Sequence, residues 1–122
     1  MDEYTDLMAA ADLADGAMTG VKVGSHLYLV ANVGGRYHVT DGRCPHLMGN
    51  LTKGTLDGTV VECPLHGSRF DLVDGSVVRW TSWSGAAAGI ARALRHPRGI
   101  TVYECEVRDG RVTVGPARAT AR

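Results

Sequence analysis

Two short segments of this chain each place a cysteine beside a proline and a histidine. The first is Cys44-Pro45-His46 and the second is Cys63-Pro64-Leu65-His66, with sixteen residues between His46 and Cys63. Two thiolates and two imidazoles are enough to hold one metal centre, and this mixture of soft sulfur and borderline nitrogen ligands suits iron or zinc. The repeated pair therefore predicts one metal site formed by two loops.

The residues next to these ligands favour a site that is ordered in advance. Pro45 and Pro64 directly follow the two cysteines, where a fixed backbone torsion lowers the entropic cost of ordering the loops. Gly49 and Gly67 allow backbone N–H groups to approach closely. Such N–H groups are natural partners of sulfur atoms that carry negative charge.

Glycine-containing turns divide the chain into short apolar stretches. The turns are Gly34-Gly35, Asp57-Gly58, Asp74-Gly75 and Asp109-Gly110, which separate 27–33 from 36–40, 51–56 from 59–62, 69–73 from 76–80, and 100–108 from 111–114. These are strong hairpin signals, so they predict an antiparallel all-β domain. A sheet fixes the separation of the loops that it carries, and the two ligand segments are expected to converge on one site.

Three segments depart from the strand pattern. Within 81–99, apolar residues at Ala87, Ile90, Ala91 and Leu94 have helical spacing, so a short helix is expected over 85–96. It is interpreted as packed over the sheet, or alternatively as a cationic partner-binding element. Residues 1–17 are expected to be a frayed lead-in with a short helical turn, and 115–122 a loose tail, within a single domain of residues 1–122.

The remaining cysteine and histidines are assigned no ligand role. Cys105 alternates with polar neighbours along a predicted strand and is expected to point into the core as a small hydrophobe. His26 and His38 are interpreted as surface or boundary residues of strands, without partners. His96 is interpreted as part of the helix end.

Composition narrows the classes of partner. The formal net charge is zero, so a general attraction to nucleic acid or to an anionic membrane is not expected. No apolar run has membrane-spanning length, and the acidic start of the chain is unlike a secretory signal. An odd count of three cysteines favours a reducing compartment, and hence the cytoplasm. The acidic first residues and the arginine-rich last third indicate either an ordinary solvated surface or an electrostatic docking face.

The order of the ligands resembles that of Rieske-type iron–sulfur proteins. The flanks, 44–51 and 63–71, are similar to the two cluster-binding loops of that family, and the likeness extends from Met18 to Val114 with 81–99 as an insertion. The resemblance implies stacked antiparallel sheets and one [2Fe–2S] cluster. Cys44 and Cys63 would bind one iron, and His46 and His66 the other. Zinc is the rival metal, although common structural zinc sites place both cysteines before both histidines.

Two departures from the respiratory type of Rieske protein narrow the resemblance. The respiratory type has a further cysteine in each loop, joined as a disulfide, where this chain has Gly49 and Leu65. The pattern is thus closer to soluble, ferredoxin-type Rieske proteins. Ser68 matches a family serine that donates to a bridging sulfide, whereas Phe70 replaces a tyrosine that donates to a cysteine sulfur. A low to intermediate reduction potential is therefore expected.

The resemblance implies a one-electron carrier rather than an enzyme. Such ferredoxins receive electrons from a flavin reductase and deliver them to a terminal oxygenase, often a ring-hydroxylating dioxygenase. Docking is expected near His46 and His66, with an apolar rim of Leu47, Met48, Pro64 and Leu65. The alternatives are a small Rieske subunit of a larger redox enzyme of the nitrite-reductase kind, a redox sensor, and a zinc-stabilised interaction module.

Overall fold

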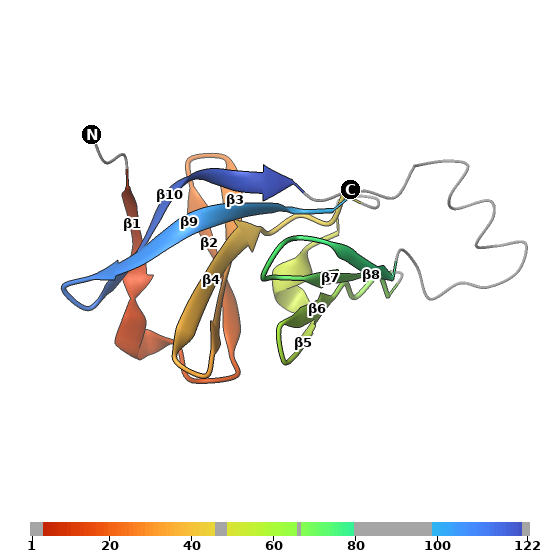
Figure 1. Cartoon of the computed structure of the whole chain (residues 1–122), viewed down its shortest axis with the longest axis horizontal. Coiled ribbons are helices and arrows are strands. Elements are labelled where there is room, and N and C mark those ends of the chain that lie inside the picture. Colours follow the sequence, from red (N-terminus) through yellow and green to blue (C-terminus); the bar gives the residue numbers. More distant parts are fainter. Residues whose placement is uncertain (1–3, 46–48, 66, 80–98, 121–122) are drawn as a thin grey trace, which may run out of the picture.

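The computed structural model describes residues 4–45, 49–65, 67–79 and 99–120, which form two antiparallel sheets (Figure 1). In the six-stranded sheet the order is β1-β10-β9-β4-β3-β2, with bounds Thr5–Ala9, Arg111–Thr120, Thr101–Arg108, Arg36–Asp41, His26–Val33 and Met18–Val23. The four-stranded sheet has the order β5-β6-β7-β8, with bounds Thr55–Asp57, Val60–Glu62, Arg69–Asp71 and Val77–Arg79. Two 3₁₀ turns, η1 (Ala10–Asp12) and η2 (Leu51–Lys53), complete the described elements. The predicted all-β class is confirmed.

The glycine-containing turns form the hairpins that the sequence predicts. Gly34 and Gly35 join β3 to β4 with φ angles of 63° and 86°. Asp109 and Gly110 join β9 to β10, also with positive φ angles, of 50° and 76°. Positive φ at both central positions matches the twist of an antiparallel pair, and glycine adopts it without steric cost. The other two turns likewise join β5 to β6 and β7 to β8.

Two apolar clusters lie on opposite faces of the six-stranded sheet. Leu29 and Ala31 on β3 belong to the first cluster, which reaches Phe70 and Val61 of the smaller sheet. Val30, between them, belongs to the second cluster, which gathers residues from β4, β10 and the segment after η1. Successive side chains of a strand point to opposite faces, so β3 is buried on both sides. The first cluster also contains Cys44 and Cys63, so the core and the candidate site are continuous.

The predictions for both ends of the chain were wrong. Residues 5–9 form β1, which pairs with β10, and β10 continues to Thr120 where a loose tail was expected. Only η1 matches the expected helical turn. The two strands pair with each other across the length of the chain, for example with Thr5 opposite Val114. The residue pattern within either segment does not reveal such pairing. Gly115-Pro116 lies where the pairing of β10 with β9 shifts register.

Two other predicted elements need comment. The strand expected at 51–56 begins only at Thr55, because 51–53 form the 3₁₀ turn η2. Asn50 caps this turn, since its Oδ1 accepts from Thr52 N at 3.0 Å and from Thr52 Oγ1 at 2.5 Å. The helix expected over 85–96, with His96, lies outside the described residues. Across the described ranges, no helix is long and apolar enough to cross a membrane.

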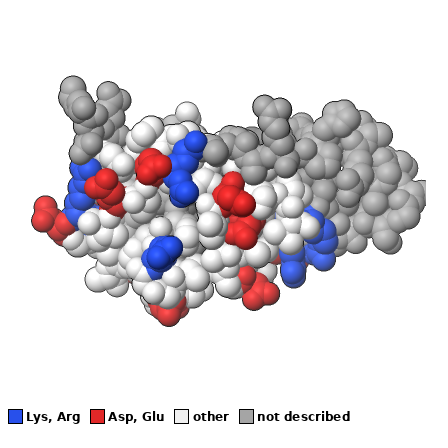
Figure 2. Space-filling model, viewed as in Figure 1, with Lys and Arg blue, Asp and Glu red and all other residues white. Residues whose placement is uncertain are grey.

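Charges at the two ends of the chain lie close together and form ion pairs. Arg111 Nε lies 3.0 Å from Asp6 Oδ1, because β1 runs beside β10. Arg118 likewise lies 3.5 Å from Glu104, across the β9–β10 hairpin. Figure 2 shows basic and acidic groups close to one another on the face in view. Such exposed pairs contribute at most about 1 kcal/mol each, so they support the solvated-surface interpretation for these residues.

Candidate metal centre

The first ligand loop begins where β4 ends and is closed at its base. Cys44 N donates to Gly49 O at 2.7 Å, and Leu51 N donates to Gly42 O at 2.8 Å. Arg43 and Asn50 form an antiparallel bridge between these two bonds. Together these contacts fix the positions at which the loop leaves β4 and enters η2. Cys44 lies inside this closed base and is fully buried.

The second ligand loop is a tight turn between β6 and β7. Cys63 N donates to Ser68 O at 2.8 Å, and Gly67 N donates back to Cys63 O at 3.1 Å. Gly67 has a φ of 70°, a conformation that strongly favours glycine. Glu62 and Arg69, the strand residues at the base of the turn, form an ion pair at 2.7 Å. The cysteine is 1% exposed.

The two loops touch each other at Gly49. A Cβ atom at this position would lie 2.8 Å from Cys63 Sγ and 2.9 Å from Leu65 Cδ1. Gly49 therefore lets the first loop lie directly against the cysteine of the second. This contact confirms the predicted convergence of the two loops, as far as the described residues show it.

The described residues fit a metal centre with two sulfur ligands. Both cysteines are buried, both are free of disulfides, and both lie in loops held by backbone hydrogen bonds. His46 and His66 lie outside the described residues, so their ligand roles stay predictions. Among the residues that the structure describes, no group of three His, Cys, Asp or Glu side chains is suited to a metal ion.

Residues near the second loop differ in their environment. Ser68 is fully buried in the second loop, where the resemblance implies a hydrogen bond to the metal centre. Phe70 is fully buried in the first apolar cluster and contributes packing but no hydroxyl group. Leu65 is 56% exposed, so an apolar side chain faces solvent beside the buried cysteine.

Sequence reasoning missed a polar cluster that holds the start of the first loop. His26 Nε2 lies 2.9 Å from Asp41 Oδ1, and Tyr103 OH donates to the same oxygen at 2.7 Å. The prediction that His26 has no partner was therefore wrong. Burial, and then the bond to Asp41, raises the pKa of Tyr103 above its usual range. The Gly34-Gly35 hairpin register, which sets Tyr28 opposite Asp41, was the available signal.

His38 and Cys105 lie in environments close to those predicted from the sequence. His38 is a half-buried boundary residue, and burial, followed by the nearby Arg36, lowers its pKa. Cys105 packs against the second apolar cluster, and burial, followed by Glu106, raises the pKa of its thiol to about 11. A thiol in this state is a poor metal ligand at neutral pH, since ligation requires the thiolate.

Comparison with known families identifies this pair of loops. A model of the Rieske [2Fe-2S] domain matches residues 3–90, which include both cysteine segments. The chain belongs to the Rieske family. A Rieske domain implies a [2Fe–2S] cluster, so the resemblance found in the sequence is confirmed.

Relatives of this Rieske protein include ferredoxin components of oxygenase systems. It is 34% identical over 112 residues to ferredoxin CarAc of Metapseudomonas resinovorans, covering 91% of this chain and 92% of the relative. It is 33% identical over 75 residues to a ferredoxin component of naphthalene 1,2-dioxygenase/salicylate 5-hydroxylase systems in Ralstonia sp, covering 62% and 72%. A chain in the complex of reduced oxygenase and oxidised ferredoxin of carbazole 1,9a-dioxygenase matches with a TM-score of 0.76 and 29% identity, covering 98% and 99%.

Proposed function

We propose that this Rieske protein is a one-electron carrier that takes electrons from a reductase and passes them to a terminal oxygenase. The observation that carries the proposal is the match to ferredoxin CarAc over nearly the whole length of both chains. The solved structure of a similar chain comes from a complex of oxygenase and ferredoxin. In this role the protein supplies electrons to an oxygenase and is not itself the enzyme.

The proposed cluster ligands are Cys44 and Cys63 on one iron and His46 and His66 on the other, with one [2Fe–2S] cluster per chain. Burial of both cysteines and the contact of the two loops at Gly49 support this assignment. When bound, such a cluster accepts and releases one electron, at about −150 to +300 mV in this family. Imidazoles in place of two thiolates make it less negative, which favours reduction.

The described residues around the cysteines would hold the ligands and exclude water. Pro45 and Pro64 restrict the loops. Gly49 permits the close approach of the two loops, and Gly67 adopts the positive φ that the second turn requires. Ser68 is buried where a hydroxyl donor would make reduction easier. Phe70 lacks the hydroxyl that the respiratory type has at this position, which is the reason to propose a low to intermediate potential.

The proposed docking surface surrounds His46 and His66. Pro64 and Leu65 are exposed immediately beside the buried Cys63, and they would form part of an apolar rim. Leu47 and Met48, the other predicted rim residues, lie outside the described residues. Partners would be a flavin reductase and a terminal oxygenase. We also propose that residues 1–122 act as one domain in the cytoplasm, where a reducing environment keeps the three cysteines out of disulfides.

Leu65→Asp tests the docking surface. The holoprotein is mixed with NADH, a flavin reductase and the terminal oxygenase of a ring-hydroxylating system, and electron delivery to the oxygenase is followed by stopped flow. We expect the substitution to leave the iron content unchanged and to slow delivery. The added carboxylate also lowers the reduction potential, so the slowing should exceed what the measured change in potential explains. Val107→Asp is the matched control, because Val107 is 48% exposed on β9 and lies outside both ligand loops.

The same measurements separate the proposal from its rivals. A wild-type protein that is reduced but never accelerates any oxygenase would contradict the carrier role. Co-purification with a large catalytic subunit would favour the subunit of a larger redox enzyme. A colourless protein with stoichiometric zinc would favour the interaction module.

A further inference from the structure

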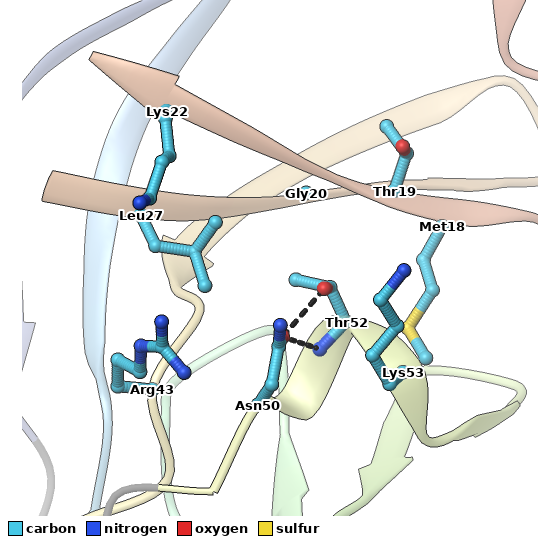
Figure 3. A pocket seen from close by; sticks show the side chains of 9 residues that line it. All are labelled: Met18, Thr19, Gly20, Lys22, Leu27, Arg43, Asn50, Thr52 and Lys53. Carbon is cyan, nitrogen blue, oxygen red and sulfur yellow. Dashed lines mark hydrogen bonds between the residues drawn. The ribbon is translucent and has the colours of Figure 1, made fainter. Parts of the chain in front are cut away.

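A basic pocket lies between β2 and the base of the first ligand loop. It has a volume of about 520 Å³. Figure 3 shows Lys22 of β2 and Arg43 of the loop start on one side of Asn50 and Thr52. Lys53 of η2 lies on the other side, near Met18, and all three cations line the pocket. The sequence contains only two lysines, Lys22 and Lys53, and both line this pocket.

The three cations of this pocket have no acidic partner among the described residues. Arg69, Arg79, Arg108, Arg111 and Arg118 each lie within 4.0 Å of a carboxylate oxygen. No such ion pair is formed by Lys22, Arg43 or Lys53 in the described part of the chain, and no carboxylate lines the pocket. The adjoining pocket, which shares Arg43, contains Asp41, but that carboxylate is already bonded to His26 and Tyr103. The basic pocket therefore presents positive charge that its own walls do not neutralise.

The neutral polar groups of the pocket also favour a ligand that accepts hydrogen bonds. Asn50 Oδ1 accepts from both the N–H and the hydroxyl of Thr52, which leaves the amide NH₂ of Asn50 as the group available to a ligand. An NH₂ group only donates, as do ammonium and guanidinium groups. A ligand that satisfies this pocket must supply several acceptor oxygens and negative charge.

The pocket lies where β2 and η2 pack together, next to the base of the first ligand loop. A Cβ atom at Gly20 would lie 2.9 Å from Thr52 Oγ1, so β2 and η2 are in direct contact. Arg43 and Asn50 form the bridge that closes the loop containing Cys44. A partner seated here therefore contacts the loop that carries the proposed cluster ligands. The pocket has no aromatic wall, unlike the mostly apolar sites that enclose small organic ligands.

We infer that this pocket receives carboxylate side chains from the surface of an acidic redox-partner protein. The inference rests on the proposed carrier function, which requires a protein partner near the cluster loops. Complementary charge would speed association and set the orientation of the partner. Because salt screens charges beyond about 8 Å at physiological ionic strength, association should slow as salt is added.

The two lysines provide a direct test. Reductive ¹³C-methylation of the full holoprotein keeps the charge of both lysines and gives each an NMR signal. The probe is a hexaglutamate peptide, added at low ionic strength. We expect both lysine signals to shift saturably, and the affinity to fall as sodium chloride is added. Shifts no larger than those caused by sodium chloride alone at matched ionic strength would overturn the inference.

Single substitutions make the test specific. Lys22→Gln and Lys53→Gln should each weaken peptide binding about two- to fivefold. This is the loss expected for one exposed ion pair, and it is read from the NMR signal of the remaining lysine. Arg36→Gln is the matched control, since Arg36 also has no ion pair among the described residues but lines a different pocket. If Arg36→Gln weakens peptide binding equally, the loss reflects the net charge of the protein and not this pocket, and the proposed site is wrong.

Inorganic phosphate is the comparison ligand. Phosphate binding as tight as that of the peptide would assign the pocket to free anions and overturn the protein-docking inference. The NMR readout does not depend on electron transfer. Peptide binding by a protein that supports no oxygenase would contradict the carrier function alone, and a working carrier that does not bind the peptide would contradict only the docking inference.

Discussion

Gly49→Ala tests whether the contact between the two loops is needed for the metal centre. A Cβ atom at this position would lie 2.8 Å from Cys63 Sγ and 2.9 Å from Leu65 Cδ1. Leu65 is 56% exposed and can turn away into solvent. Cys63 is 1% exposed and is held by its bond to Ser68 O, so its sulfur has little freedom to move.

The size of the required movement decides the expected result. Ordinary contact begins at 3.4 Å, so Cys63 Sγ and the new Cβ must separate by about 0.6 Å. Metal–ligand distances tolerate only about 0.2 Å. Overpacking of this kind costs about 1–3 kcal/mol of folding free energy. Changes next to metal ligands typically lower metal affinity about 10- to 100-fold, and we expect Gly49→Ala to fall in that range.

Iron and sulfide per chain, measured after anaerobic purification and a chelator challenge, give the readout. Gly24→Ala is the control, because Gly24 has a φ of 62° and nothing within 4 Å of the added Cβ. That substitution should cost about 1 kcal/mol of stability through backbone strain and leave the iron content unchanged. If Gly49→Ala retains iron as well as the wild type does, the inferred role of the loop contact is wrong.

Three further predictions concern single side chains. Ser68→Ala should lower the reduction potential by about 20–60 mV, the equivalent of one hydrogen bond of about 0.5–1.5 kcal/mol, and an unchanged midpoint in protein-film voltammetry would show that Ser68 does not bond the cluster. Because His38 has a lowered pKa in the fold, the unfolded chain binds more protons below pH 6.5, so stability should fall as the pH drops below that value. His38→Gln should make the stability, measured by thermal unfolding between about pH 7.5 and 5.5, depend less on pH than in the wild type. An equal pH dependence would show that His38 is not the responsible group. Cys105, with a thiol pKa of about 11, should react with iodoacetamide at pH 8 far more slowly than free cysteine, and Cys105→Ser should keep a full complement of iron by chemical analysis.

Local chemistry made much of the fold predictable. The turns at Gly34-Gly35 and Asp109-Gly110 require positive φ angles, and both form hairpins with those angles. The two cysteine segments were visible because metal ligands need particular residue types at short spacing. Their burial and contact at Gly49 followed from sheets that place both loops at one end of the first apolar cluster.

Long-range pairing was the part that the sequence did not reveal. β1 pairs with a strand about a hundred residues away, and the second half of β10 pairs with β9 beyond a bulge. The composition of both segments therefore resembles that of unpaired chain termini. His26 has one partner, Asp41, that the hairpin register could have indicated, whereas its second partner, Tyr103, lies 77 residues away in the sequence. The basic pocket is similar, since Lys22 and Lys53 line one pocket only when η2 packs on β2.

The identity of the metal centre is the central claim, and EPR of the dithionite-reduced protein, with iron, sulfide and zinc quantified on the same sample, tests it most directly. A Rieske centre predicts two irons and two sulfides per chain and the EPR signal of a reduced cluster with histidine ligands. Cys44→Ser, Cys63→Ser, His46→Ala and His66→Ala should each abolish that signal. A colourless, EPR-silent protein with one zinc per chain, or a signal that survives loss of His46 and His66, would contradict the account.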